Sequence, residues 1–209
     1  MGRGPGAHHA QRYAEIADAV LAIVTDHGLA AVSLAEVAAQ ANVSPGRVQH
    51  YFPAKRQLLE AAFERGNELS SARIRAKTGA DLQAAEPRLV LTTVLGELIP
   101  YDAATEAHMR VRQSFHALAF AEKTIAARLR VLYADFHRQM ADLIARDQQA
   151  GRIPAALDPH EAALTLVALA EGLAAYVLTG VTPAATARTR VLAAIADLYD
   201  HNPPESAQP

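Results

Sequence analysis

The chain has 209 residues, of which 51% are hydrophobic, and its formal net charge is -2. It contains no cysteine, which excludes disulfides, a thiolate nucleophile and a cysteine-based zinc site. A net charge this small also excludes a polycation that coats nucleic acid, so any contact with nucleic acid has to come from a local patch. The abundance of alanine, with glycine and proline where helices would start and stop, predicts an all-α fold.

Residues 1–10 are rich in glycine and are predicted to form a flexible arm. Arg3 offers a functional alternative, because a basic arm can reach into a minor groove of DNA. The adjacent His8 and His9 are too few for a metal site. A first helix is then predicted over about 11–27, where apolar residues recur at helical spacing.

Two short helices joined by a tight turn are predicted over residues 33–52. Ser33 followed by Glu36 is a capping-box motif, and it opens a helix too short to be stable alone. Asn42 tolerates the left-handed conformation of a turn. Ser44 and Pro45 then restart a helix, with a capping hydroxyl followed by a proline at the first helical position.

The second of these helices carries a polar and aromatic face that suits DNA. Val48 faces inward, while Gly46 lets a backbone approach closely and Arg47 can reach guanine or phosphate. Gln49 can read adenine edges, and Lys55 can hold a phosphate. The predicted DNA-binding residues are Ser33, Ser44, Pro45, Gly46, Arg47, Gln49, His50, Tyr51 and Lys55.

In unbroken order over about residues 12–60, the sequence resembles the amino-terminal signature of TetR-type repressors. The matching residues are Gly28, Ser33-Leu34, Val37-Ala38, Ala41-Asn42-Val43-Ser44, Gly46, Val48, His50-Tyr51-Phe52, Lys55 and Leu58-Leu59. The chain departs from the family where Arg47-Val48-Gln49 replaces the usual Thr-Leu-Tyr, and at Pro45. The resemblance implies a helix-turn-helix that binds double-stranded DNA, and the departures concern the operator sequence it reads.

Six further helices are predicted downstream from capping residues and breakers. Their expected ranges are about 54–77, 87–99, 102–120, 124–150, 159–179 and 183–200. The predicted fold is therefore all-α with about nine helices. Its expected domains are a three-helix DNA-binding domain at 11–56 and a larger helical ligand-binding and dimerisation domain at 57–200, followed by a flexible tail at 201–209.

The last two predicted helices mix large apolar residues with many alanines, which allow close helix approach. They could pack within the chain's own core. The resemblance instead implies a four-helix homodimer interface, and a two-fold dimer is also what presents two recognition helices about one helical turn of DNA apart. The candidate interface residues are Leu164, Val167, Ala168, Glu171, Ala175, Leu178, Val191, Leu192, Ile195 and Leu198.

The resemblance also implies a pocket for a small-molecule effector in the larger domain. The candidate lining residues are Phe115, His116, Tyr133, Phe136, His137, Met140 and Tyr176, which would suit a mostly apolar ligand. His116 and His137 each lie beside an apolar stripe, where a histidine can equally be a surface or a satisfied core residue. Arg110 and Arg112 are expected to be solvated.

A soluble cytoplasmic protein is expected, because no signal peptide is apparent and no apolar run approaches the length of a membrane span. The longest such run, 162–170, is interrupted by Glu171 and Gly172.

Enzymatic chemistry is not expected. Glu97, Asp102 and Glu106 are spaced like solvated helix residues and caps, and the sequence has no His-x-x-x-His pair, Gly-x-Ser-x-Gly elbow or Walker loop. We therefore expect no catalytic residue, metal or cofactor. The sequence predicts a bacterial repressor that binds a palindromic operator as a homodimer, at the nucleoid, and that a small molecule releases. A helical protein-interaction adaptor is the alternative, and an enzyme built on a helical bundle a more remote one.

Overall fold

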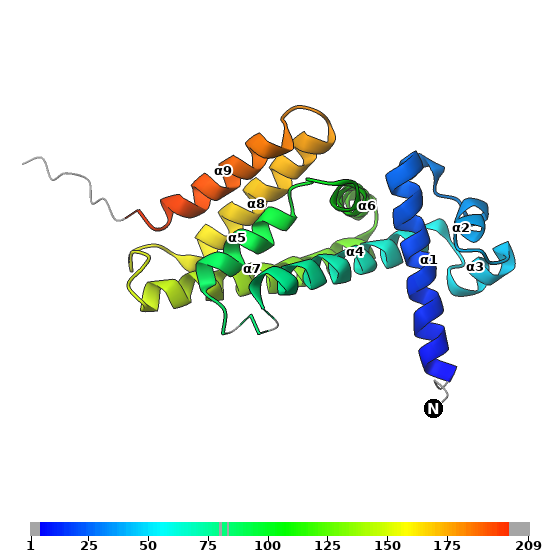
Figure 1. Ribbon diagram of the computed structural model, residues 1–209, viewed down its shortest axis with the longest axis horizontal. Helices are drawn as coiled ribbons and strands as arrows, with labels where there is room; N and C mark the ends of the chain where they lie inside the picture. Colours follow the sequence, from blue (N-terminus) through cyan, green and yellow to red (C-terminus); the bar gives the residue numbers. More distant parts are fainter. Residues whose placement is uncertain (1–4, 80, 83, 201–209) are drawn as a thin grey trace, which may run out of the picture. The chain divides into compact units, whose positions relative to one another are not determined.

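The computed structural model describes residues 5–79, 81–82 and 84–200, and within these residues every regular element is helical (Figure 1). The elements are α1 (Pro5–His27), the short 3-10 helix η1 (Leu29–Ala31), α2 (Leu34–Gln40), α3 (Pro45–Tyr51), α4 (Lys55–Thr78), α5 (Pro87–Glu97), α6 (Ala103–Ala121), α7 (Lys123–Gln149), α8 (Pro159–Leu178) and α9 (Ala184–Asp197). The all-α prediction is confirmed. Arg3 and the expected tail at 201–209 lie outside the described residues.

Helix α1 starts six residues earlier than the predicted 11–27, at Pro5, so residues 5–10 of the expected flexible arm are helical. The sequence explains the difference. Proline suits the first position of a helix, and alanine is the strongest helix former, so Ala7 and Ala10 favour extension of the helix despite the nearby glycines.

The two short helices α2 and α3 begin at the predicted caps. Ser33 Oγ accepts a hydrogen bond from the Glu36 amide at 3.1 Å, and Ser44 Oγ accepts one from the Arg47 amide at 3.2 Å. The turn between them passes through Asn42, whose φ of 52° lies in the left-handed region. Local sequence signals thus fix the start of both helices and the turn that joins them.

The described residues pack as two compact units, and the first combines the chain up to Arg73 with residues 100–127. This unit holds α1, α2, α3, most of α4, and α6, which packs against α1. Arg65 ties α4 to α1, because its Nε donates to Asp18 Oδ1 at 2.7 Å. The packing therefore follows a different division from the expected one at residues 56 and 57.

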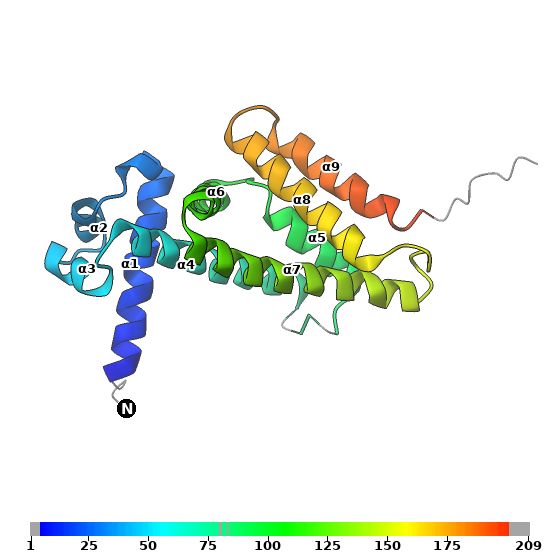
Figure 2. The same cartoon turned by 180° about the vertical axis from the view of Figure 1, so that it is seen from behind.

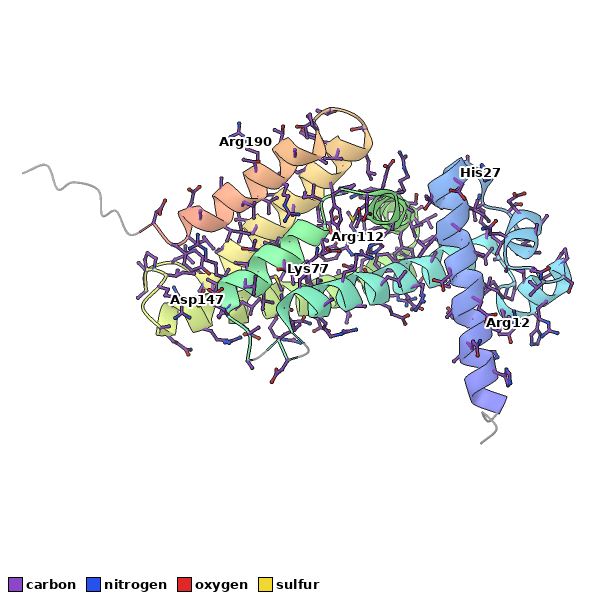
Figure 3. The ribbon with its side chains drawn as sticks, in the orientation of Figure 1. Arg12, His27, Lys77, Arg112, Asp147 and Arg190 are labelled. Atoms are coloured by element: carbon purple, nitrogen blue, oxygen red, sulfur yellow. The ribbon has the colours of Figure 1, made fainter. Side chains whose placement is uncertain are left out.

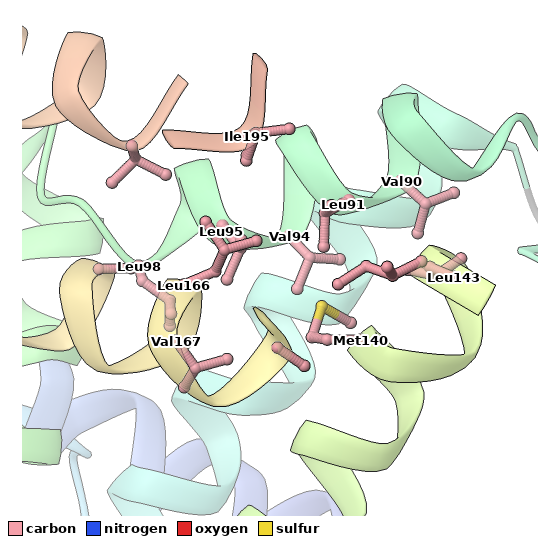
Figure 4. Packing of buried hydrophobic residues seen from close by; sticks show 14 of the residues in the cluster. Val90, Leu91, Val94, Leu95, Leu98, Met140, Leu143, Leu166, Val167 and Ile195 are labelled. Atoms are coloured by element: carbon pink, nitrogen blue, oxygen red, sulfur yellow. The ribbon is translucent and has the colours of Figure 1, made fainter. Parts of the chain in front are cut away.

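The second unit comprises residues 74–99 and the chain from Arg128 onward, with α5, α8, α9 and the remainders of α4 and α7. Its core lies where α5 packs on α8 and α9, with α7 contributing Met140 (Figure 4). Helices α8 and α9 run side by side, joined by a short turn through Gly180, whose φ is 75° (Figures 1 and 2).

Three of the candidate dimer residues belong to this core. Val167, Val191 and Ile195 are almost fully buried within the single chain. Their predicted place in a dimer interface is therefore wrong, because each belongs to the apolar core of its own unit. The face of α8 that remains outside carries Leu164, which is 47% exposed, and Tyr176, which is 54% exposed.

Helix α8 is long and apolar enough to cross a membrane by length and composition alone, and 28% of that stretch is buried within the chain. This corrects the expectation that no apolar run reaches such a length. Glu171 and Gly172 interrupt the run, but the alanines, leucines and valines around them outweigh one charge and one glycine. A core helix of a soluble protein can have the same composition, but such a helix is mostly buried. Only 28% of this stretch of α8 is buried, so its exposed apolar face requires an explanation of its own.

A buried carboxylate joins three segments of the second unit. Asp147 lies near the end of α7 (Figure 3) and is 0% exposed. Its Oδ1 accepts hydrogen bonds from the Arg152 guanidinium. Tyr199 donates its hydroxyl to Asp147 Oδ2 at 2.5 Å, and the Arg88 guanidinium lies 4.5 Å from the centre of the Tyr199 ring. These contacts link α7, the start of α5 and the segment after α9.

Candidate DNA-binding surface and effector site

The outer face of α3 carries most of the residues predicted to bind DNA. Val48 anchors the helix in the first unit's core, and the other side chains of α3 are exposed except that of Tyr51, which is half-buried. The exposed residues are Pro45, Gly46, Arg47, Gln49 and His50. The first turn of α3, where Pro45 occupies the first position, thus presents Gly46 beside the guanidinium of Arg47, and the amide of Gln49 follows in the next turn.

Three other predicted DNA-binding residues flank α3. Ser33 and Ser44 are exposed at the starts of α2 and α3, and their hydroxyl oxygens cap the helices. A capping hydroxyl still carries a proton, which it can donate to a phosphate oxygen. Lys55 is exposed at the first position of α4.

Tyr51, the last predicted DNA-binding residue, lies in a cluster of rings at the end of α3. Its ring centre is 4.7 Å from that of His9, 5.5 Å from that of His50 and 6.3 Å from that of Phe52. Tyr13, one turn after His9 on α1, lies 4.7 Å from Phe52. The contact of His9 with Tyr51 is not predicted from the sequence, because residues 1–10 are expected to form a flexible arm. The spacing of His9 and Tyr13 by four residues is the signal that could have shown it.

Helices α4 and α6 meet within the first unit through buried polar groups. Arg112 (Figure 3), expected to be solvated, is only 4% exposed. Its Nη1 donates to Asn67 Oδ1 at 3.3 Å. The same oxygen lies 3.2 Å from Nε2 of His108, which is also buried. The Arg112 guanidinium also lies 5.7 Å from the ring centre of Phe63. The contact with α4 explains why Arg112 is buried.

The candidate effector residues divide between the two units. Phe115 is buried in the first unit, where its ring stacks on Phe63 at 4.8 Å, and His116 is half-buried on the same helix. In the second unit Phe136 packs against the core cluster that contains Met140. Tyr176, by contrast, is 54% exposed in the single chain.

A carboxylate and two aromatic rings come together between α7 and α8. The Tyr133 hydroxyl donates to Glu171 Oε1 at 2.6 Å, and the Tyr133 ring lies 5.8 Å from that of His137. Two of the predicted effector residues are thus adjacent, beside a carboxylate that the prediction assigned to the dimer interface. In the part of the chain that the structure describes, no three His, Asp or Glu residues are grouped in a way that could hold a metal ion.

Comparison with protein families gives two matches that together span most of the chain. Residues 16–62 match the tetR family of bacterial regulatory proteins, and residues 87–200 match the C-terminal region of BetI-type transcriptional repressors. The HTH-type transcriptional regulator BetI of Burkholderia mallei is 30% identical over 163 residues, which cover 78% of this chain and 79% of BetI. The regulator PksA of Bacillus subtilis is 26% identical over 170 residues, covering 81% and 80% of the two chains.

Solved structures agree with these matches. A Rhodococcus sp. chain described as a TetR-family transcriptional regulator superposes with a TM-score of 0.74 and 28% identity, covering 91% of this chain and 100% of that one. A protein from Saccharomonospora viridis in complex with choline has the same fold, with a TM-score of 0.76, 21% identity and coverage of 92% and 97%. On the strength of both family matches and the BetI relative, this chain belongs to the TetR family of transcriptional regulators, a family of regulators rather than enzymes, with a BetI-type C-terminal region.

Proposed function

We propose that this regulator is a repressor that binds a palindromic operator as a homodimer in the bacterial cytoplasm, at the nucleoid, and that a small-molecule effector releases it. The observation that carries the proposal is the exposed polar face of α3, held by two capped helix starts and one buried valine, Val48. A helix presented in this way can enter the major groove, where base edges distinguish one sequence from another.

Gly46 supports a close approach to DNA. A side chain added at Gly46 would have no neighbouring atom within 4 Å, and the residue is not among the glycines with positive φ. The fold therefore does not itself require glycine at this position. A sugar-phosphate backbone passing close to the first turn of α3 would require it, and Arg47 and Gln49 would then face the base edges.

The outer face of α8 supports a homodimer. Leu164, Ala168, Gly172 and Tyr176 are all exposed and follow one another at intervals of four residues, so they form one stripe along the helix. A side chain added at Gly172 would meet nothing within 4 Å of its own chain. A second copy related by two-fold symmetry would cover this stripe and bring two recognition helices to one operator.

The group formed by Tyr133 and Glu171 supports a particular class of effector. A carboxylate beside aromatic rings attracts a cation, and the apolar side chains of Phe136 and Met140 lie on the same unit. We propose a mostly apolar effector with a cationic head, of which choline, bound by the Saccharomonospora viridis protein, is the simplest example. The proposed effector contacts are Tyr133, Phe136, His137 and Met140, which all lie in this unit.

Release would follow from differential binding of the effector to two states of the dimer. An effector that prefers the state in which the two copies of α3 no longer match the half-site spacing lowers the affinity for the operator, and the operator lowers the affinity for the effector by the same factor.

A binding experiment tests the DNA-binding half of the proposal. The full-length protein selects duplexes from a random library, and the selected operator is titrated at several salt concentrations. Gln49→Ala should relax the base preference at one position and weaken the free energy of operator binding by about 1–3 kcal/mol. Lys55→Ala should weaken binding to all sequences, and it should reduce the slope of log affinity against log salt concentration by about 1. If neither substitution changes the affinity, α3 is not the recognition helix.

Calorimetry tests the effector half. Choline is titrated beside dimethylbutanol, its uncharged carbon isostere, into the wild type and Glu171→Gln. We expect binding heat only when choline is titrated into the wild type, and none with dimethylbutanol or with Glu171→Gln. Adding choline should also lower the affinity of the wild-type protein for the operator. Thermal stabilisation by anionic or sugar-like compounds alone would contradict the proposed effector class.

A further inference from the structure

The first turns of α1 pair with the end of α3 through two aromatic contacts in register. The rings of His9 and Tyr51 are 4.7 Å apart and inclined by 31°, and those of Tyr13 and Phe52 are 4.7 Å apart and inclined by 47°. His9 and Tyr13 are four residues apart on one face of α1, and their partners are consecutive residues. Both contacts lie within the first unit.

The two contacts differ in burial. Phe52 is buried in the core, so the contact of Tyr13 with Phe52 fixes α1 against α3. His9 is exposed and Tyr51 is half-buried, so their contact lies at the rim of the unit. The rim contact adds little to the core. It does hold the ring of Tyr51, the last residue of α3, beside the exposed residues of that helix. The Tyr51 ring also meets the ring of His50 edge-on at 5.5 Å.

We propose that His9 is a positioning residue for operator binding: its ring holds the Tyr51 ring so that the phenol hydroxyl donates to a phosphate of the operator. This rests on the proposed role of α3 in binding DNA. A tyrosine hydroxyl is one of the donors that proteins use towards phosphate oxygens. A ring already held by a neighbouring ring loses less rotamer freedom when it binds, so the same hydrogen bond contributes more to affinity.

The experiment is a double-mutant cycle in the full-length protein. His9→Ala, His9→Phe, Tyr51→Phe and the double variant His9→Ala with Tyr51→Phe are compared with the wild type. Two quantities are measured for each: the dissociation constant for a duplex that the wild-type protein selects from a random library, and the midpoint of thermal unfolding. Tyr51→Phe keeps the ring contact and removes only the hydroxyl, so it separates positioning from packing.

If His9 positions the hydroxyl, His9→Ala weakens operator binding by about threefold to tenfold, the range expected from loss of one aromatic contact. His9→Phe keeps a ring at this position and binds within about twofold of the wild type. In the Tyr51→Phe background His9→Ala has no further effect on affinity, because the hydroxyl it positioned is gone. Any change in the unfolding midpoint is the same in both backgrounds.

Two results overturn the inference while leaving the proposed function intact. In one, His9→Ala has the same effect on affinity with and without the Tyr51 hydroxyl, which means that His9 contacts DNA itself or acts through stability. In the other, His9→Ala has no effect although Arg47→Ala weakens binding. If Arg47→Ala and Gln49→Ala also have no effect, the recognition helix is wrong and the inference fails with it.

Discussion

Gly66 is a position on α4 where no side chain fits. A β-carbon added there would lie 2.1 Å from Cδ2 of His108 on α6, and also within 3 Å of two further atoms of that ring. The imidazole has little freedom to move, because it is buried and its Nε2 lies 3.2 Å from Asn67 Oδ1. The absence of a side chain at Gly66 is therefore what lets α4 and α6 approach within the first unit.

We expect Gly66→Ala to destabilise the protein by about 1–3 kcal/mol, the usual cost of overpacking a core. Urea unfolding would measure the difference. Gly96→Ala is the matched control, because a β-carbon at Gly96 meets only the Arg188 guanidinium, at 3.8 Å. The control should be neutral or stabilising by up to about 1 kcal/mol, since alanine is the better helix former. Equal effects of the two substitutions would contradict the steric explanation.

Tyr199 lies at the other buried polar contact, where its hydroxyl donates to Asp147. Burial raises the pKa of Tyr199, and the hydrogen bond to the Asp147 carboxylate raises it further. The stabilisation is therefore present below the unfolded pKa of about 10 and is lost only as the pH rises through the higher folded value. At neutral pH the contribution is complete.

Tyr199→Phe should cost about 1–3 kcal/mol at neutral pH, because it leaves one oxygen of a fully buried carboxylate without its donor. Denaturant unfolding between about pH 6 and pH 9 should give a constant difference from the wild type. Tyr51→Phe removes a hydroxyl from a half-buried ring of the first unit, away from Asp147, and is the control, with an expected change near zero. A similar loss in both variants would show that the buried carboxylate is not the cause.

At the scale of elements, α6 begins with a complete capping box. Asp102 Oδ1 accepts from the Thr105 amide at 2.8 Å, and Thr105 Oγ1 accepts from the Asp102 amide at 3.0 Å. Burial of Asp102 opposes ionisation, but the hydrogen bonds from Thr105 outweigh it and lower the pKa of the carboxyl. The stabilisation is therefore present above the unfolded pKa of about 3.9 and is lost as the pH falls through the lower folded value.

Asp102→Ala should destabilise the protein by about 1 kcal/mol at neutral pH through loss of the cap. The difference from the wild type should narrow as the pH falls below about 4, where the carboxyl becomes protonated. Asp102→Asn keeps a capping oxygen and should retain most of the stability without this dependence on pH. Thermal unfolding at a series of pH values measures all three proteins, and a pH-independent deficit for Asp102→Ala would contradict the role of the charge.

The starts of most helices could be predicted from the sequence because capping is local. Ser33, Ser44, Asp102 and Asp158 each hydrogen-bond to amides two or three residues later, so a short window contains the whole signal. The start of α1 and the short helix η1 are not predictable in this way, because neither begins with such a cap and glycines and alanines compete at the start of α1. The outer face of α3 was predictable because one apolar residue, Val48, fixes the phase of a seven-residue helix.

The buried faces of the longer helices required tertiary information. An arginine such as Arg112 is usually solvated. Its burial is explained only by the close approach of α4 to α6, which the absence of a side chain at Gly66 permits. Val167 and Leu164 are both apolar residues of α8, yet one is buried and the other exposed, because the packing of the other helices of the unit on α8 decides which face is covered. The same applies to Tyr133 and Glu171, whose contact joins residues 38 positions apart.

At the scale of the whole molecule, the proposed dimer predicts the effect of a charge on the outer face of α8. Leu164→Glu should weaken self-association by about a hundredfold or more, since an unpaired carboxylate buried between two helices costs about 3 kcal/mol or more. Gln139→Glu adds the same charge at an exposed position of α7 and is the control. Analytical ultracentrifugation of both variants decides the matter, and a Leu164→Glu protein that remains dimeric would place the interface elsewhere.

The place of α6 in the first unit determines which segments must be exchanged to build a chimera of two such regulators. The compact unit that carries α3 takes its sequence from two stretches, the chain up to Arg73 and residues 100–127, with α5 in between. A chimera that exchanges only the first stretch would pair a foreign α1 and α4 with the native α6, and would have to accommodate His108 and Phe115 against surfaces that never faced them. The modular unit of this regulator is therefore discontinuous, and exchanging its operator specificity intact means transplanting both stretches or only the outer face of α3.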